Sequence, residues 1–279
     1  MASAMRQNVP ERPPMAVLKM IDSRHFYTAL KALEFHEKCL VDISKSGLRI
    51  VVNDQNCIQG IAYLNRELFA EYFLIRDEDI IFGIPLYVFM ESINAFGTGV
   101  MGMLKLIYDG PGLPFKIMLE RDGVVLRSLI DTRNPEEILD FDFNPISPAA
   151  RVIMKPEMLQ EAFRELDQSS LSVEFMINPF SLNIITKGDL GVIQVEFPAH
   201  SEQMEQLDCR HKVEYSYKLC LLKRVIPSLN MCSKLSIRID HRGILSMQFI
   251  IERYDNTLIF LEFYCIPEIP TSEEENGTD

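Results

Sequence analysis

Short runs of β-branched and aromatic residues, separated by Gly and Asp turns, fill much of this chain of 279 residues. Such runs are typical of strands, because branched and aromatic side chains pack well on a pleated, half-buried surface. The pattern predicts strands over residues 39–45, 48–53, 58–64, 104–108, 115–119, 124–130, 171–177, 182–186, 192–197, 213–217, 235–239, 245–251 and 258–264.

Four other stretches space their apolar residues as a helix does, and they predict helices over residues 23–35, 85–96, 156–166 and 218–226. Ser23 is a suitable N-cap for the first helix. Pro85 and Pro156 open the second and third, where a proline in the first turn is tolerated. We expect the fourth helix to stop at Pro227.

The order of these elements occurs twice: a strand, a helix, a run of strands, a helix and three strands. A repeat of about 130 residues indicates an internal duplication. We therefore expect an α+β chain of two similar domains, each an antiparallel sheet with two helices, and all four helices on one side of the molecule. The predicted parts are a disordered leader (1–14), domain 1 (15–131), an interdomain connector (132–148), domain 2 (149–267) and an acidic disordered tail (268–279).

The composition is that of a globular protein, with 47% hydrophobic and 24% charged residues. Its net charge of −12 excludes a broad basic face, so that any contact with DNA must be local. No apolar run is long enough to span a membrane. The six cysteines contain no Cys-x-x-Cys pair and favour reduced thiols inside a cell.

Three segments resemble the PCNA-like DNA sliding clamps: Val41 to Asp54, Gly188 to Phe197, and Leu261 to Ile269 with the acidic tail that follows. They keep the order that they have in that family. Two more segments, Pro135 to Phe143 and Cys232 to Gly243, resemble the Rad one-type subunit of the nine-one-one checkpoint clamp.

The resemblance implies a non-enzymatic subunit, without cofactor or metal, of a nuclear ring formed with two other PCNA-like subunits. A clamp loader would open and close this heterotrimer around double-stranded DNA at damage sites. The ring would bind DNA without reading its sequence, and it would recruit repair and checkpoint proteins.

Cations on the inner helices of such a ring would face the phosphates of DNA. By alignment with the family pattern we expect this role for Arg24, Lys31, Arg164 and Lys223, and Arg224, next to Lys223, is a fifth candidate. The alternative for these cations is an ordinary solvated helix face. The second helix departs from the pattern, with Glu91, Ser92 and Asn94 at positions expected to be exposed.

A partner-docking pocket is expected on the outer face, from the family pattern. Its matching residues are Ile58, Ile138, Leu139, Phe141, Ile266 and Pro267, and a packed connector is the alternative. For the ring contacts, we expect the edge strands to be 115–119 and the region 171–177.

Two other functions remain open: a homotrimeric replicative clamp, which the few inner lysines disfavour, and a metal-dependent DNA exonuclease that would use Asp140 and Asp142. The Gly-x-Gly-x-x-Gly at residues 97–102 follows a helix and precedes a strand. This is the reverse of the order in a dinucleotide fold. The five histidines have no metal-ligand spacing.

Overall fold

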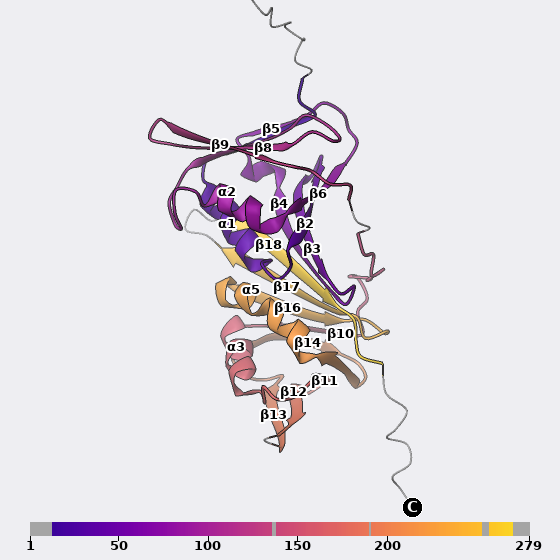
Figure 1. Cartoon of the computed structure of the whole chain (residues 1–279). Coiled ribbons are helices and arrows are strands. Elements are labelled where there is room, and N and C mark those ends of the chain that lie inside the picture. The colour runs from indigo at the N-terminus through magenta and orange to yellow at the C-terminus, as the bar shows by residue number, and fades with distance from the viewer. Residues whose placement is uncertain (1–12, 136–137, 190, 253–256, 270–279) are drawn as a thin grey trace, which may run out of the picture.

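The computed structural model describes residues 13–135, 138–189, 191–252 and 257–269, and Figure 1 shows them as antiparallel sheets with short helices. Apart from residues 13–14 and 268–269, the predicted leader and acidic tail lie outside the described residues. The α+β class predicted from the sequence is confirmed in the coarse sense that antiparallel strands dominate and the helices are few.

The two halves of the chain contain the same series of elements. The first half has β1 (Ala16–Met20), α1 (Ser23–Ala32), β2 (Lys38–Ser44), β3 (Gly47–Asp54), β4 (Ile58–Asn65), η1 (Arg66–Leu68), β5 (Glu71–Leu74), β6 (Ile80–Pro85), α2 (Leu86–Ile93), β7 (Met103–Tyr108), β8 (Phe115–Arg121) and β9 (Val124–Ile130). The second half has β10 (Ala150–Met154), α3 (Pro156–Glu165), β11 (Ser172–Asn178), β12 (Ser181–Gly188), β13 (Gly191–Pro198), β14 (Met204–Cys209), β15 (Val213–Lys218), α4 (Leu219–Leu222), η2 (Lys223–Val225), α5 (Ile226–Met231), β16 (Lys234–Ile239), β17 (Leu245–Glu252) and β18 (Leu258–Cys265).

All the strands predicted with residue limits are present, and β1, β5, β6, β10 and β14 join them. The prediction that Pro227 ends the fourth helix is wrong. A 3-10 turn, η2, interrupts the helix first, and α5 then starts at Ile226. Pro227 therefore lies in the first turn of a new helix, where its missing N–H breaks no hydrogen bond.

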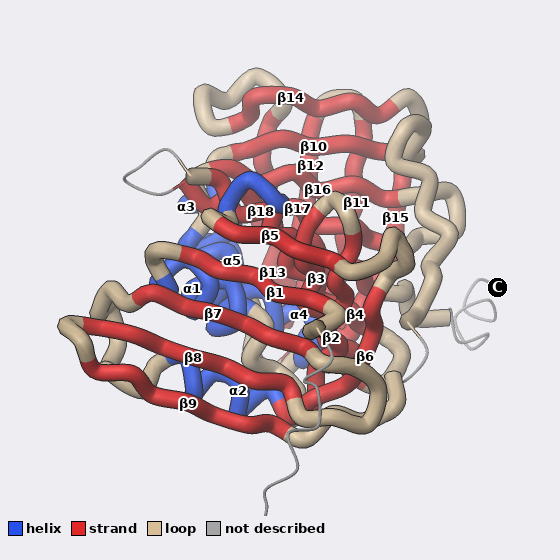
Figure 2. Tube along the Cα trace, turned by 90° about the horizontal axis from the view of Figure 1, so that it is seen from above, coloured by secondary structure: helices blue, strands red, loops and turns tan. Residues whose placement is uncertain are grey.

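The strands form three sheets with orders β5-β1-β7-β8-β9, β14-β10-β16-β17-β18-β4-β3-β2-β6, and β13-β12-β11-β15. Figure 2 looks down on the first of these sheets, with β9 at its rim. The nine-stranded sheet contains strands of both halves, because β18 of the second half pairs with β4 of the first.

The prediction that 115–119 and 171–177 form the edges is wrong. β8 lies between β7 and β9, and β11 lies between β12 and β15. β8 forms a hairpin with β9, and β11 forms a hairpin with β12, so in each case a further strand lies outside the predicted edge. Among the described strands, β9 and β13 are the terminal ones of these two sheets on that side.

The helices form one row in the order α2, α1, α5, α3, and this row lies along one side of the molecule (Figure 1). The apolar faces of the helices point to the sheets: α1 contacts β4 and β18, α2 contacts β2 and β6, and α5 contacts β17. Helices α1 and α5 also contact each other, which brings the two halves together a second time.

Aromatic rings fill the core where β18 meets the first half. Phe263 of β18 is 1% exposed and packs with Phe249 of β17 and Phe35, at ring-centroid distances of 5.6 and 5.9 Å. Gly60 of β4 lies opposite Phe263. A Cβ at Gly60 would meet the side chains of Leu33 and Phe263 within 3.0 Å, so this position requires glycine.

We expect Phe263→Ala to lower the free energy of unfolding by about 3–5 kcal/mol, because it leaves a cavity at the place where the halves join. Urea denaturation followed by circular dichroism measures this loss. Leu258→Ala is the control on the same strand, since Leu258 is 39% exposed and should cost far less. A loss below about 1 kcal/mol for Phe263→Ala would contradict the packing described for this join.

Candidate functional surfaces

The row of helices carries all five cations that the sequence predicts for an inner surface. Arg24 and Lys31 lie on α1, Arg164 lies on α3, and Lys223 and Arg224 lie in η2. Lys31, Arg164 and Arg224 are exposed, whereas Arg24 and Lys223 are half-buried. The structure therefore brings these five residues onto one row, from segments that are far apart in the sequence.

Three of the five cations are occupied by a carboxylate of the chain itself. Arg24 bonds to Asp22 at 2.6 Å, Lys31 bonds to Glu34, and Arg224 reaches Asp54 at 3.3 Å. Arg164 and Lys223 have no ion pair within the part of the chain that the structure describes. Only the Lys31–Glu34 pair is exposed on both sides and can readily exchange its partner for a phosphate, because the Asp22 and Asp54 side chains are 14% and 11% exposed.

Asp22 explains why α1 begins at Ser23. Its carboxylate accepts a hydrogen bond from the Arg24 backbone N at 3.0 Å, as an N-cap does, and three more from Nε and Nη2 of the guanidinium. Burial raises the pKa of Asp22, but the hydrogen bonds from Arg24 and the nearby charges of His25 and Arg24 outweigh burial and leave the pKa below its usual value. The N-cap is thus Asp22 rather than Ser23, the residue that the sequence pattern indicated.

The solvent face of α2 contains no cation. Tyr87 and Val88 are 66% and 43% exposed, and Glu91 is exposed beside them. Ser92 was expected to be exposed but is buried, and its hydroxyl donates to the Val88 carbonyl at 2.8 Å. Asn94 is half-buried at the C-cap. This helix therefore offers DNA apolar side chains and a carboxylate that would repel phosphates, as the sequence indicated.

The residues of the predicted docking pocket gather around the end of β18. Ile58 pairs with Cys265, and the Ile266 N donates to the Cys57 O at 3.0 Å. Ile58 is 0% exposed and belongs to the core, whereas Ile266 is 36% exposed and Pro267 is half-buried. Docking of a partner at this site thus stays a prediction. Because Ile58 is buried, it can hold the exposed residues of the site in place but cannot contact a partner itself.

The connector lies on the outer face of the nine-stranded sheet. Ile138 packs on Leu40, Val51 and Ile61, and the Leu139 carbonyl accepts a hydrogen bond from Gln59 at 3.2 Å. Phe141 stacks on Tyr264 of β18, with 5.4 Å between ring centroids and 18° between ring planes. The connector residues of the predicted pocket therefore fasten the connector to the sheet, as in the packed connector that the sequence left as the alternative. Being half-buried, they leave only part of their surface for a partner.

The two connector carboxylates each have a partner within the chain. Asp140 accepts a hydrogen bond from the backbone N of Asp142, and the Asp142 carboxylate lies 3.9 Å from the guanidinium of Arg242. Among the described residues, no group of three or more His, Cys, Asp or Glu side chains is placed to hold a metal. A cation beside a carboxylate competes with a metal for it.

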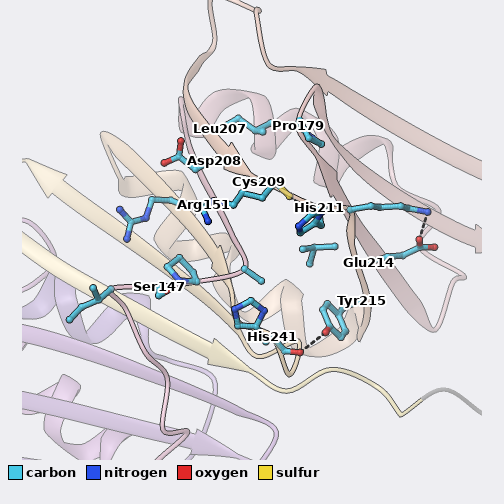
Figure 3. Close-up of a pocket in the computed structure, with 16 residues that line it drawn as sticks. Ser147, Arg151, Pro179, Leu207, Asp208, Cys209, His211, Glu214, Tyr215 and His241 are labelled. Carbon is cyan, nitrogen blue, oxygen red and sulfur yellow. Dashed lines mark hydrogen bonds and ion pairs between the residues drawn. The ribbon is translucent and has the colours of Figure 1, made fainter.

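A groove of about 1120 Å³, which the sequence did not indicate, lies beside β14 and β15 (Figure 3). Segments near residues 148, 179, 210 and 241 line it, and no local pattern reports that they meet. Arg151, Arg210 and Lys212 stand against Asp208 and Glu214, and Lys212 is bonded to Glu214. Charges this closely balanced lack the excess of one sign that nucleic acid requires.

Known proteins similar to this chain identify its family. A family model described as "Repair protein Rad1/Rec1/Rad17" matches residues 16–251. The chain belongs to this family. It is 34% identical over 265 residues to the human cell cycle checkpoint protein RAD1, with 92% of this chain and 94% of that protein covered.

Two other relatives show the range of the family. The chain is 29% identical over 259 residues to the RAD1 homolog mrt-2 of Caenorhabditis elegans, with 92% and 95% of the two chains covered. It is also 29% identical over 184 residues to the DNA repair exonuclease REC1 of Mycosarcoma maydis, but this match covers only 54% of the chain and 40% of that protein. In the described part of this Rad1-family chain, no helix is long and apolar enough to cross a membrane.

We expect Asp22→Ala to destabilise the chain by about 1–2 kcal/mol at neutral pH, because α1 loses its N-cap. Asp22→Asn retains a capping oxygen and should cost less. The pKa of Asp22 is lowered in the folded chain, so the carboxylate contributes stability at neutral pH and loses it as the pH falls through the folded pKa. Urea titrations at several pH values should therefore show the difference between wild type and Asp22→Ala shrinking below about pH 4. A difference that stays constant down to acid pH would mean that the charge of Asp22 does not act in this way.

Proposed function

We propose that this chain is a non-catalytic subunit of a heterotrimeric ring clamp that is loaded around double-stranded DNA at damage sites. It acts there in the DNA-damage checkpoint, in the nucleus, as a platform for repair and checkpoint proteins. The observation that carries the proposal is the pairing of β18 with β4 inside the chain. The strands that correspond to these two in the other half, β9 and β13, lie at open sheet edges and can form the same pairing between chains.

The correspondence follows from the strand registers. Phe115 pairs with Ile130 in the first half as Leu245 pairs with Cys265 in the second, so β9 corresponds to β18. Ser181 pairs with Pro198 as Gly47 pairs with Asn65, so β13 corresponds to β4. The contact that joins β18 to β4 within the chain can thus recur between β9 of one subunit and the β13 counterpart of the next. Head-to-tail contacts of this kind close into a ring when the rotation allows it.

Exposed apolar side chains on both open edges support this assembly. Leu129 of β9 is 66% exposed and Val192 of β13 is 67% exposed. In the register of the internal pair Tyr264–Gln59, these two positions lie opposite each other across the contact. Natural proteins protect apolar strand edges, and a partner strand that continues the sheet does so while it satisfies the free backbone groups.

The row of helices would line the hole of the ring. Its few unpaired cations, Arg164 and Lys223, suit a subunit that shares the work with two others, since affinity for DNA grows with the number of phosphates contacted by the whole ring. The proposal includes two similar domains (15–131 and 149–267) with the connector (132–148) between them. A dedicated clamp loader would open the ring.

The family names support the checkpoint role more than an enzymatic one. The human and worm relatives are named for the checkpoint protein RAD1, and they match nearly the whole chain. The exonuclease REC1 matches about half of it, and metal-dependent exonuclease activity is the second candidate. If purified chain degraded DNA with Mg²⁺, and Asp140→Ala or Asp142→Ala abolished the activity, the non-catalytic part of the proposal would be wrong.

We expect Leu129→Glu and Val192→Glu each to break one ring contact, because a charge would be buried against an apolar partner strand. The affinity of that contact should fall at least about tenfold. The measurement is the mass, by light scattering, of complexes co-expressed with the two partner clamp chains of the same genome. Leu113→Glu is the matched control, since Leu113 is 48% exposed but lies in the turn between β7 and β8. Full three-chain rings from both edge variants would overturn the proposal.

We expect replacement of Arg164 and Lys223 by Gln to lower the salt dependence of DNA binding by the assembled ring. Each lost phosphate contact should lower the slope of log K against log salt by about 0.9. Arg121→Gln is the control, because Arg121 is an exposed arginine at the end of β8, outside the helices, and it is paired with Asp122. An unchanged slope in the double variant would show that these side chains do not meet DNA.

A further inference from the structure

The turn between β16 and β17 holds the connector through one side chain. Arg242 donates from Nη2 to the carbonyl oxygens of Phe141 and Asp142, both at 2.8 Å. About a hundred residues separate the donor from its acceptors in the sequence. Both bonds come from Nη2, whose two hydrogens are shared among these carbonyls and Oδ2 of Asp240.

Arg242 is itself fixed on the side of the turn. Its Nε and Nη2 donate to Oδ2 of Asp240 at 3.0 and 2.8 Å. Asp240 is 6% exposed, and its other oxygen accepts hydrogen bonds from the backbone N of Arg242 and of Ile244. A buried carboxylate with four hydrogen bonds is a rigid anchor.

The turn cannot easily shift, because β15 supports it. The hydroxyl of Tyr215 donates to the His241 carbonyl at 2.9 Å, as Figure 3 shows, and the hydroxyl of Tyr217 donates to the Gly243 carbonyl at 2.8 Å. Gly243 has φ +82°, and a Cβ there would meet the Tyr215 ring at 2.4 Å. Arg242 therefore extends from a fixed base.

The connector adopts a strained backbone at the point where Arg242 binds it. Asp142 has φ +47°, a left-handed conformation that is uncommon for a residue other than glycine. The Asp140 carboxylate stabilises it by accepting a hydrogen bond from the Asp142 N at 2.8 Å. The two carbonyls on either side of this bend meet the same guanidinium nitrogen.

Side chains supply the remaining connections. Between residues 138 and 148, all described, the backbone makes no hydrogen bond to other backbone groups. Gln59 binds the Leu139 carbonyl and Arg151 binds the Pro145 carbonyl. The Arg238 guanidinium lies 5.3 Å from the centre of the Phe143 ring. Arg242, which donates two charged hydrogen bonds, is the strongest of these connections.

We propose that Arg242 is the positioning residue of the connector surface. It fixes the backbone of residues 141 and 142, and through them the places of Phe141 and its neighbours on the sheet. The Arg242 side chain is 51% exposed, so that the connection can be broken without unfolding the core. The consequence for partner proteins rests on the proposed function, in which they dock at the connector: their affinity depends on Arg242, whereas ring assembly at β9 and β13 does not.

The test uses the purified chain, which contains no tryptophan. Phe143→Trp places one reporter on the connector, next to Tyr264 and Arg238. Adding Arg242→Ala should shift the tryptophan emission to longer wavelength and raise its quenching by acrylamide about threefold, because the connector leaves the sheet more often. Arg242→Lys, which has one amine in place of the fork, should give an intermediate value.

Hydrogen exchange on the chain without the reporter gives an independent measurement. In Arg242→Ala, amides of residues 138–144 should exchange about tenfold faster, while β16, β17 and β18 keep their protection. Arg210→Ala is the matched control, since Arg210 is also an exposed arginine in a turn of the second half and should change neither reading.

A second variant loosens the same connection from the opposite side. Asp142→Val leaves Arg242 intact but disfavours the left-handed backbone, so it should reproduce the faster exchange, whereas Asp142→Gly should not. The inference is overturned if Arg242→Ala leaves residues 138–144 unchanged, or if it destabilises the whole sheet equally. Neither reading requires a ring, so the inference can fail while ring assembly succeeds, or hold while assembly fails.

Discussion

The pairing of β18 with β4 is the interaction on which the rest of the structure depends. Hydrogen bonds between these strands merge part of each half into one sheet of nine strands, and Phe263 and Gly60 meet at this join. The row of helices follows from it, because α1 contacts both strands of the join. Because β9 corresponds to β18 and β13 corresponds to β4, the pairing of β18 with β4 leaves β9 and β13 at the edges of their sheets. In the proposed ring, neighbouring chains would be joined at these edges in the same way.

The outer face of the join carries a buried ion pair that ties the connector to the sheet. Arg238 and Glu262 bond at 2.7 Å, with side chains 7% and 8% exposed, and Ser246 adds a hydrogen bond to Glu262 at 2.8 Å. Burial and the charge of Glu262 raise the pKa of Tyr63 to about 12, so its hydroxyl stays protonated beside the carboxylate. Buried charges are tolerated only when they are paired and covered. Phe143 covers Arg238, and the connector is therefore part of what permits this pair.

The sequence predicts those elements whose signal is local. The runs rich in branched and aromatic residues at 48–53 and 245–251 and the helical spacing in 156–166 predict their elements correctly. The internal duplication that the repeated order indicates stays a prediction. Strands such as β5 and β14 are missed because they are short or polar and gain their place from pairing with β1 and β10. The edge strands are misassigned because a hairpin pattern does not tell which of its strands ends the sheet.

The sequence predicts which residues belong to a site, but it does not predict which residues they bond to. The five cations are on the predicted row, yet the bond between Arg224 and Asp54 spans 170 residues, and no local pattern reports it. The same holds for Gln59 with Leu139 and for Arg242 with the connector, where separations of 80 and about 100 residues are bridged by the sheet. Whether a cation is available to DNA is thus decided by tertiary contacts.

The central claim is that the open edges β9 and β13 are made for other clamp subunits, and the mass of the purified chain in solution tests it most directly. Light scattering over a wide range of concentrations should give a monomer near 32.1 kDa. A stable species of about three times that mass would instead mean that β9 and β13 of identical chains join. The chain would then be a self-sufficient homotrimeric clamp, and its assignment to a heterotrimer would be wrong.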